Sequence, residues 1–202
     1  MKQEQLEFIE ITKPVFSEKQ AVERKLRFLE ARILGFPTVN FTVQSNDLVY
    51  VPYRAFLFWF EIGHKPLINR TDSKETKGEL AFTFDCNEIH PYEYNLDELG
   101  PLEIQKIKLA DTGGQVLEEA CSREEALSKT EFYINKKVLR QLYGTVGELT
   151  LLDDFLFYRP ARRLQVVYKG SKSINDRFAY MDDYELQNDH IAGLRSRIGG
   201  GS

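Results

Sequence analysis

Residues 48–63 read LVYVPYRAFLFWFEIG, the most apolar stretch of the chain and the one that holds its single tryptophan. A membrane-spanning helix needs about 20 predominantly apolar residues, and this stretch is shorter and is interrupted by Pro52 and Arg54. An interior proline also disfavours a helix in water. Because β-branched and aromatic residues favour strands, we expect strands here, with Pro52 at an edge, a bulge or a corner between two short strands.

The segment after Pro52 is apolar on both of its alternating faces. Phe56 and Phe58 share one face, and Trp59 lies on the other. Strands of this kind are usually covered on both sides. We therefore expect one face to pack on a helix and the other to meet a second sheet, a second domain or a partner.

A second copy of this pattern lies further along the chain. Residues 155–170, FLFYRPARRLQVVYKG, again place an apolar-aromatic run before a proline, an arginine and a strand that ends at glycine. Upstream of each copy, a serine is followed three positions later by Gln20 or Glu125, which is the signature of a capping box. The spacing of apolar residues predicts helices over 18–34 and 123–143.

The sequence therefore predicts an α+β fold built as a tandem repeat, in which each repeat is a capped helix followed by an antiparallel β-meander. We place the first repeat at residues 1–90 and the second at 122–190. Residues 91–121 form a connector in which the alternation of LEIQKIKLA fits a strand. Residues 191–202, which end in GGGS, form a flexible tail. The alternative is that two serine-capped helices and two proline-bearing strands match by chance.

Each repeat has the order helix, strand, proline-marked strand and a strand that ends in aspartate, at Asp85 in ELAFTFD and at Asp182 in RFAYMD. Together with the S-x-E-E-A-L helix start at residues 122–127, this order resembles small PepSY-type domains, and more broadly the helix-on-sheet layout of cystatins. The resemblance concerns the two repeats and implies binding or inhibitory modules, with no catalytic residue carried over. The chain departs from the PepSY pattern after each aspartate, where CNEI and DYEL replace the usual turn and glycine.

The composition is typical of a folded protein. The chain of 202 residues is 42% hydrophobic and 29% charged, with a net charge of −4, which argues against disorder and against a general attraction to nucleic acid or anionic membranes. Its N-terminus, MKQEQLEFIEITKP, is charged throughout and does not resemble a secretory signal. With two cysteines, Cys86 and Cys121, we expect reduced thiols and a cytoplasmic protein, and the alternative is one disulfide between them.

Candidates for metal binding are His64, Cys86 and His90. A structural zinc site needs four ligands, and the chain has neither a C-x-x-C nor an H-E-x-x-H motif, so we expect no metal and no cofactor. It also lacks the glycine-rich phosphate loops and the G-x-S-x-G nucleophile motif. We therefore expect a binding module rather than an enzyme.

Two hypotheses involve the aromatic strand. The leading one is a non-enzymatic binding or protein-interaction module, in which a protein partner or a second protomer covers Phe56, Phe58 and Trp59. The alternative is a small-ligand-binding protein or enzyme with a pocket between helix and sheet. Arg54 would then anchor an acidic group of the ligand.

A third hypothesis concerns the basic strand at 158–172. Tyr158, Arg159, Arg162 and Arg163 combine aromatic and cationic side chains, as surfaces that bind anions or nucleic acid do. Lys and Arg on an edge strand also protect it from aggregation. The acidic net charge makes nucleic acid the weaker hypothesis.

Overall fold

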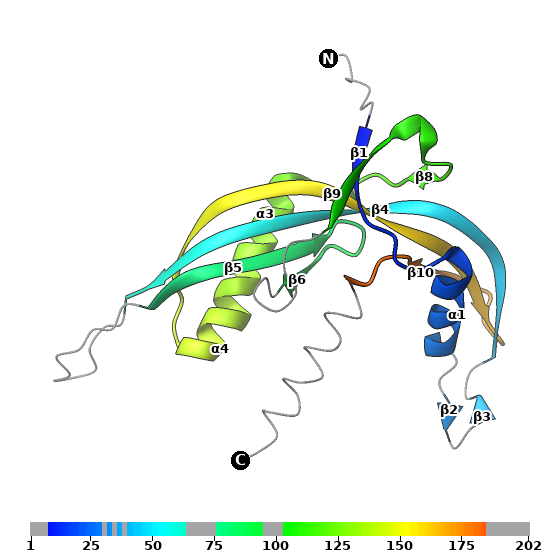
Figure 1. Cartoon of the computed structure of the whole chain (residues 1–202). Helices are drawn as coiled ribbons and strands as arrows, with labels where there is room; N and C mark the ends of the chain where they lie inside the picture. The colour runs from blue at the N-terminus through cyan, green and yellow to red at the C-terminus, as the bar shows by residue number, and fades with distance from the viewer. Residues whose placement is uncertain are drawn as a thin grey trace. The chain divides into compact units, whose positions relative to one another are not determined.

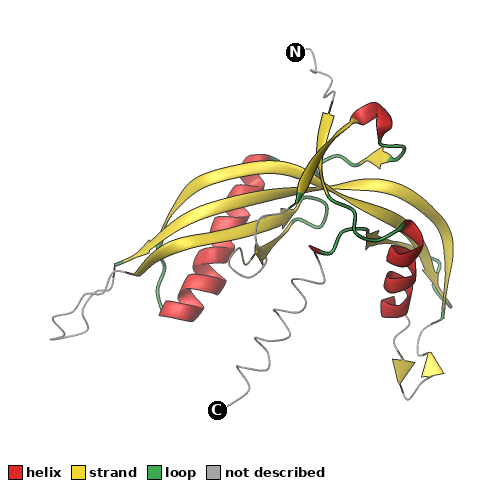
Figure 2. Ribbon diagram, viewed as in Figure 1, coloured by secondary structure: helices red, strands yellow, loops and turns green. Residues whose placement is uncertain are grey.

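The computed structural model describes residues 8–29, 32–33, 36–37, 40–63, 76–94 and 103–184. They form a mixed α/β structure with a large mixed sheet and two long helical segments (Figures 1 and 2). Its strands are hydrogen-bonded in the order β6-β5-β4-β9-β1-β7, while β10 pairs with β9 and β8 pairs with β4. The elements are, in chain order, β1 (Phe8–Thr12), α1 (Glu18–Leu29), β2 (Arg32–Ile33), β3 (Phe36–Pro37), β4 (Phe41–Ile62), β5 (Thr76–Asp85), β6 (His90–Tyr94), β7 (Ile104–Lys108), η1 (Leu109–Asp111), β8 (Gln115–Val116), α3 (Arg123–Tyr133), η2 (Ile134–Leu139), α4 (Arg140–Tyr143), β9 (Glu148–Tyr168) and β10 (Ile174–Tyr180).

Both predicted helix starts are capped by serine. The Ser17 hydroxyl accepts a hydrogen bond from the Gln20 amide at 3.4 Å, and the Gln20 side chain accepts one from the Ser17 amide at 2.9 Å. The Ser122 hydroxyl accepts from the Glu125 amide at 3.2 Å. These contacts satisfy amide groups that a helix leaves unpaired at its start.

The second helix matches its predicted span, because α3, η2 and α4 run without a break over residues 123–143. Its middle part, η2, is a π-helix, and Gly144 ends α4 in the left-handed conformation with a φ of 73°, which suits glycine. The first helix ends earlier than predicted, at Leu29, and the remaining part of the predicted span lies largely outside the described residues.

The two proline-bearing strands are longer than predicted. β4 continues through Pro52 over 22 residues, and β9 continues through Pro160 over 21 residues. The prediction of a corner between two short strands at Pro52 is therefore wrong, and β4 is not an edge strand because it lies between β5 and β9. A bulge at Pro52 stays a prediction. When the strands are aligned on these prolines, residues 47–59 and 155–167 have the same order of buried, half-buried and exposed positions.

The predicted antiparallel meander is one part of the sheet. β4 pairs antiparallel with β5, β5 with β6, and β9 with β10. Parallel contacts add to this arrangement, since β1 pairs with β9 and β8 pairs with β4. The short strands ahead of the two helices therefore make the sheet mixed.

The chain packs as two compact units, each built from separate parts of the sequence. Unit 1 comprises Met1–Val51, Glu103–Leu117 and Tyr158–Ser202, and unit 2 comprises Pro52–Leu102 and Glu118–Phe157. β4 and β9 each contribute to both units. These units are defined by contacts in space, whereas the predicted repeats, 1–90 and 122–190, are defined along the sequence. The repeat boundaries stay a prediction.

In unit 1, α1 packs on the end of β9 and on β10. The core consists of Ala21, Leu164, Val166 and Ala179, with partly buried neighbours that include Phe41 and Val43 of β4. The helix of the first predicted repeat thus packs mainly on strands of the second.

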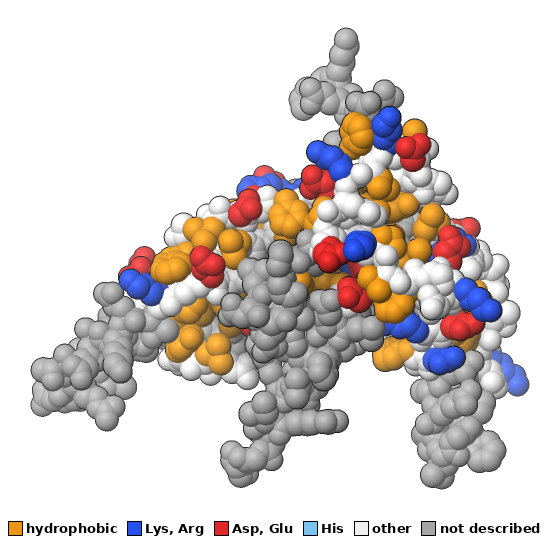
Figure 3. All heavy atoms as spheres, in the orientation of Figure 1, with side chains coloured by type: hydrophobic (Ala, Val, Ile, Leu, Met, Phe, Trp, Pro, Cys, Tyr) orange, Lys and Arg blue, Asp and Glu red, His pale blue; other side chains and the backbone are white. Residues whose placement is uncertain are grey.

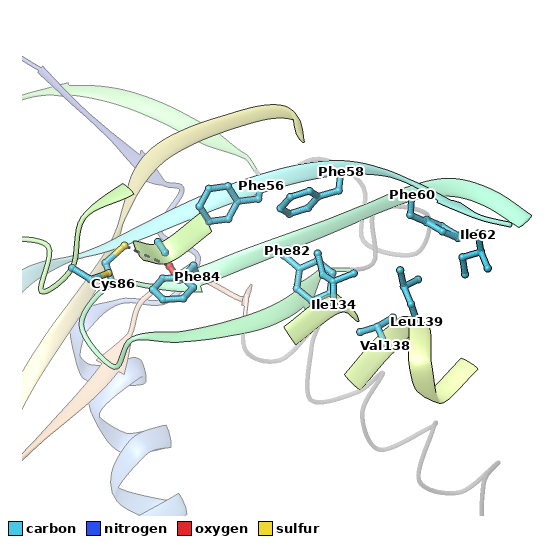
Figure 4. Close-up of a cluster of buried hydrophobic side chains, with 12 residues drawn as sticks. Phe56, Phe58, Phe60, Ile62, Phe82, Phe84, Cys86, Ile134, Val138 and Leu139 are labelled. Carbon is cyan, nitrogen blue, oxygen red and sulfur yellow. Dashed lines mark hydrogen bonds between the residues drawn. The ribbon is translucent and has the colours of Figure 1, made fainter. Parts of the chain in front are cut away.

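In unit 2, the helix formed by α3, η2 and α4 covers β4 and β5 (Figure 1). Figure 4 shows aromatic side chains of both strands directed toward the helix. The buried members of this core are Phe56, Phe58, Phe60, Ile62, Phe82, Phe84, Cys86, Cys121, Ala126, Ile134, Val138 and Leu139. The helix of the second predicted repeat therefore packs on strands of the first. Within the described residues, no helix is long and apolar enough to cross a membrane.

Candidate functional site at the two proline junctions

The proline of β4 organises the start of the helix in unit 2. The Pro52 carbonyl accepts a hydrogen bond from the Cys86 amide at 3.1 Å. In an antiparallel pair the amide of residue 52 would donate back to Cys86, but proline has no N–H. The Cys86 carbonyl accepts instead from the Ala120 amide at 3.0 Å, which fixes the segment just before the cap of α3.

Unit 1 repeats this arrangement at Pro160. The Pro160 carbonyl accepts from the Met181 amide at 2.9 Å, and the Met181 carbonyl accepts from the amides of Val15 and Phe16, both at 2.8 Å. These two residues immediately precede Ser17, the cap of α1. We call each arrangement a proline junction. Because the proline has no N–H, the carbonyl of the residue paired with it is left without its strand partner, and this carbonyl accepts a hydrogen bond from the segment that leads into a helix.

The arginine two positions after Pro52 lies in a cluster of four charges. The Arg54 guanidinium donates to Glu119 at 2.7 and 3.0 Å and lies 3.8 Å from Asp154. Arg123, the first residue of α3, also donates to Asp154, at 2.8 Å from its Nε. This hydrogen bond holds the pKa of the Asp154 carboxyl below its usual value, while burial acts in the opposite direction. The Arg54 side chain is 13% exposed, and its charge is matched within the unit.

Both cysteines belong to the core of unit 2. The Cys86 thiol lies 3.7 Å from Glu119, close enough for a weak hydrogen bond. Burial raises the pKa of the Cys86 thiol and the Glu119 carboxylate raises it further; burial likewise raises the pKa of Cys121, followed by the effect of Glu125. Thiolate is the nucleophilic and metal-binding form, so this environment disfavours both kinds of chemistry.

The matching arginine in unit 1 has different partners. Arg162 donates to the Asn46 side chain at 2.7 Å and also to the Asn46 carbonyl, and it lies 3.2 Å from the Glu18 carboxylate. Glu18 is the first residue of α1, as Arg123 is of α3. The charge of the next arginine in the basic strand is also compensated, because Arg163 donates a hydrogen bond to the Asp176 carboxylate at 3.0 Å.

Arg159 is buried in unit 1, with 1% of its surface exposed. Its guanidinium donates to both oxygens of Asp182, at 2.8 and 2.6 Å, and Asp182 also accepts from the Thr12 hydroxyl at 2.7 Å. The guanidinium carbon lies 3.7 Å from the ring centroid of Tyr180 and 4.4 Å from that of Tyr184. These contacts compensate the desolvated charge, and the neighbouring Tyr158 is buried as well.

The aromatic candidates of β4 lie on two faces. Phe56 and Phe58 belong to the core beneath α3, and Trp59 is half-buried on the opposite face of the strand. The predicted partner-binding set is therefore divided. Phe56 and Phe58 lie in the interior of unit 2, and Trp59 lies on the other face of its sheet.

The metal candidates do not form a cluster among the described residues. No group of three or more possible ligands occurs there, and His64 lies outside the described residues. Cys86 is buried, while His90 is exposed, and its ring centroid lies 5.0 Å from that of Tyr92 and 6.0 Å from that of Tyr133.

The sequence indicates the arginines but not their partners. Glu119 and Asp154 approach Arg54 from segments far away in the sequence, and no motif links them. Asp182 was visible as the last residue of a strand pattern, yet nothing in the sequence indicated that it binds Arg159. The matching positions of Pro52 and Pro160 were the signal that located both junctions.

No protein-family model, curated protein or solved structure matches this chain. The resemblance of the repeats to PepSY-type and cystatin-type domains therefore rests on the sequence motifs alone.

Proposed function

We propose that the chain is a non-enzymatic protein-interaction module. The observation that carries this proposal is that both helices expose large apolar side chains although their other faces already supply the cores. Phe28 of α1 is 79% exposed, Phe132 of α3 is 66% exposed and Leu142 of α4 is 67% exposed. Exposed aromatic and aliphatic side chains among polar ones are the usual anchors of protein interfaces.

The interior of unit 2 favours this function over a ligand pocket between helix and sheet. Phe56, Phe58 and Ile134 are at most 1% exposed and fill the space where such a ligand would lie. Arg54, the predicted ligand anchor, is bound by Glu119.

The partners of the basic strand likewise favour a protein partner over nucleic acid. Arg159 and Arg163 bind aspartates, and Arg162 binds Asn46 and Glu18. Phosphate binding needs cationic groups that are free to approach the backbone of the nucleic acid.

We also propose that the fold is a tandem repeat whose two copies exchange helices. Beyond the proline junctions, the parallel contacts support this: β1, which precedes α1, meets β9 at Tyr158, and β8, which precedes α3, meets β4 at Tyr50. Both tyrosines lie two positions before the junction proline. A repeated module offers a partner two related helix faces.

The test combines a partner selection with mass measurement. The intact chain is immobilised and used to select from a displayed library of protein fragments, and selected fragments are measured by calorimetry. We expect reproducible fragments that bind the chain, together with a native mass spectrum free of small-molecule adducts. A stoichiometric small-molecule adduct with no selected fragment would support the ligand-binding alternative instead. Light scattering separates binding to another protein from self-association.

A further inference from the structure

The helix of unit 2 carries two opposite rows of side chains. One row is buried against the sheet and recurs at every fourth position: Ala126, Thr130, Ile134 and Val138. Positions two residues further along lie on the opposite side of the helix, and all four are exposed: Ser128, Phe132, Lys136 and Arg140. We call this second row the outer stripe.

The outer stripe combines the exposed Phe132 ring with cations that have no acidic partner among the described residues. The Lys136 ammonium lies 5.9 Å from the centroid of the Phe132 ring, within the range of a cation–π contact. Lys137 and Arg140 are also exposed, and none of these three cations has an acidic partner among the described residues. By contrast, Lys129 forms an ion pair with Glu125 at 2.8 Å.

The local geometry at these lysines is unusual. Lys136 and Lys137 lie in the π-helical segment η2, whereas Ile134, Val138 and Leu139 of the same segment are buried. π-helical turns are rare and are frequent at functional sites. This segment therefore keeps three side chains in the core while Lys136 and Lys137 are exposed at the surface.

We propose that the outer stripe binds an acidic segment of a protein partner, with an apolar side chain on Phe132 and carboxylates on Lys136 and Arg140. Charge complementarity specifies the occupant, because the stripe combines one large apolar anchor with unpaired positive charge. This inference rests on the proposed function and specifies the chemistry of the partner.

A membrane surface fits the stripe less well. Helices that bind membrane interfaces insert a broad apolar face, but the apolar face of this helix is in the core (Figure 4). The space-filling view shows hydrophobic side chains at the surface near α4 (Figure 3), where Leu142 and Tyr143 are exposed. These two side chains lie in the last turn of the helix and do not form such a face.

Nucleic acid also fits less well. The first turn of α3 is acidic, with Glu124 and Glu125, and the whole chain has a net charge of −4. A continuous polyanion along the helix would meet this negative end, whereas a short acidic peptide contacts the cations alone.

The first helix supplies a matched control. In α1 the Lys25 ammonium lies 5.7 Å from the centroid of the exposed Phe28 ring, so the ring–lysine pair is the same. α1 ends at Leu29, one residue after Phe28, so no described residue of α1 follows the ring at the spacing of Lys136 and Arg140. Phe28→Ala therefore tests the general effect of removing an exposed helix phenylalanine.

The experiment is a selection from a random peptide library on the intact chain, followed by fluorescence anisotropy with the enriched peptides. We expect peptides in which Asp or Glu flank a large apolar residue. Phe132→Ala and Lys136→Glu should each weaken binding about tenfold or more, as removal of an interface hot spot does. Phe28→Ala should weaken binding of these acidic peptides less than Phe132→Ala does, because no described residue of α1 follows Phe28 at the spacing of Lys136 and Arg140, and added salt should weaken binding. Thermal unfolding checks that these surface variants remain folded.

The outcomes separate the two proposals. Enriched peptides without acidic residues, or an equal loss with Phe28→Ala and Phe132→Ala, overturn the outer stripe and leave the interaction module standing. If no peptide is enriched, the outer stripe is overturned, and the interaction module is decided by the fragment selection and by light scattering. Binding of phosphatidylserine vesicles or of a single-stranded oligonucleotide that is abolished by Lys136→Glu, with no enriched peptide, assigns the stripe to lipid or nucleic acid and overturns the protein partner.

Discussion

The two proline junctions share their backbone contacts and differ in their charges. Pro52 and Pro160 each leave a neighbouring carbonyl free for the segment that enters a helix. Around Arg54 there are two acids and a second arginine, whereas Arg162 faces Asn46 and the exposed Glu18. The comparison teaches that the missing proline N–H sets the backbone arrangement, while the side chains around it vary without changing the arrangement.

A second difference lies one position before each proline. Arg159 precedes Pro160 and is buried with Asp182, whereas Val51 precedes Pro52 and is buried as an apolar side chain. An aliphatic residue and an ion pair therefore occupy matching strand positions. An apolar side chain needs no partner, but a buried ion needs every one of its contacts.

The largest effect is expected at this position. Arg159→Met leaves the Asp182 carboxylate buried without its partner, so we expect the free energy of unfolding to fall by about 3–5 kcal/mol. Urea denaturation measures the change. The double variant Arg159→Met, Asp182→Leu should recover part of the loss, because it removes both charges. If Arg159→Met were as stable as the wild type, the Arg159–Asp182 ion pair would contribute no more stability than an apolar side chain such as Val51 at the matching position.

The next effect compares the two matched arginines. Arg54→Met removes hydrogen bonds to a carboxylate in a partly buried cluster and should lower the free energy of unfolding by about 1.5–3 kcal/mol. Arg162→Met removes contacts to an amide and to an exposed carboxylate and should cost about 0.2–1 kcal/mol. Parallel urea titrations of the two variants give the difference. Equal losses would mean that the charge cluster adds no stability to its junction.

The acidic partner of Arg54 adds a pH dependence to unit 2. The pKa of Asp154 is lowered in the folded state by the hydrogen bond from Arg123. Its contribution to stability is therefore present above its unfolded pKa, about 3.9, and is lost as the pH falls through the lower folded value. Asp154→Asn should reduce stability at neutral pH and reduce the loss of stability on acidification, as measured by thermal unfolding across the pH range.

The matched substitution in unit 1 sharpens this test. Asn46→Asp places a carboxylate near Arg162 and should introduce the acid sensitivity that Asp154→Asn removes. A variant whose stability changes with pH as the wild type does would show that the positions of Asn46 and Asp154 are not equivalent.

The features that can be predicted from the sequence are those whose cause is local. Ser17 and Ser122 cap their helices through amides three residues away, and the helix over 123–143 follows from its own apolar spacing. The strands on which each helix packs were not predictable, because these contacts form between segments that are far apart in the sequence. For the same reason Arg54 looked like a free anchor: Glu119 and Asp154 reach it only in the fold.

A small effect is also expected at the prolines themselves. Replacing proline by alanine restores conformational freedom to the unfolded chain, which should lower the free energy of unfolding by about 0.4–1 kcal/mol at each site. The new N–H can donate to the carbonyl of Cys86 or Met181. A carbonyl oxygen has two lone pairs, so the helix-entry segments retain a weakened bond rather than losing it. We therefore expect Pro52→Ala and Pro160→Ala to have comparable, modest effects in thermal unfolding.

Hydrogen exchange separates this mechanism from a general loss of stability. In Pro52→Ala the Ala120 amide must share its acceptor with the new N–H, so it should exchange faster while amides of unit 1 such as Phe16 keep their rates. Pro160→Ala should show the reverse, with faster exchange at Val15 and Phe16 and an unchanged rate at Ala120. A large change at one proline with none at the other would mean that the two junctions are similar in geometry but do not hold their helices in the same way.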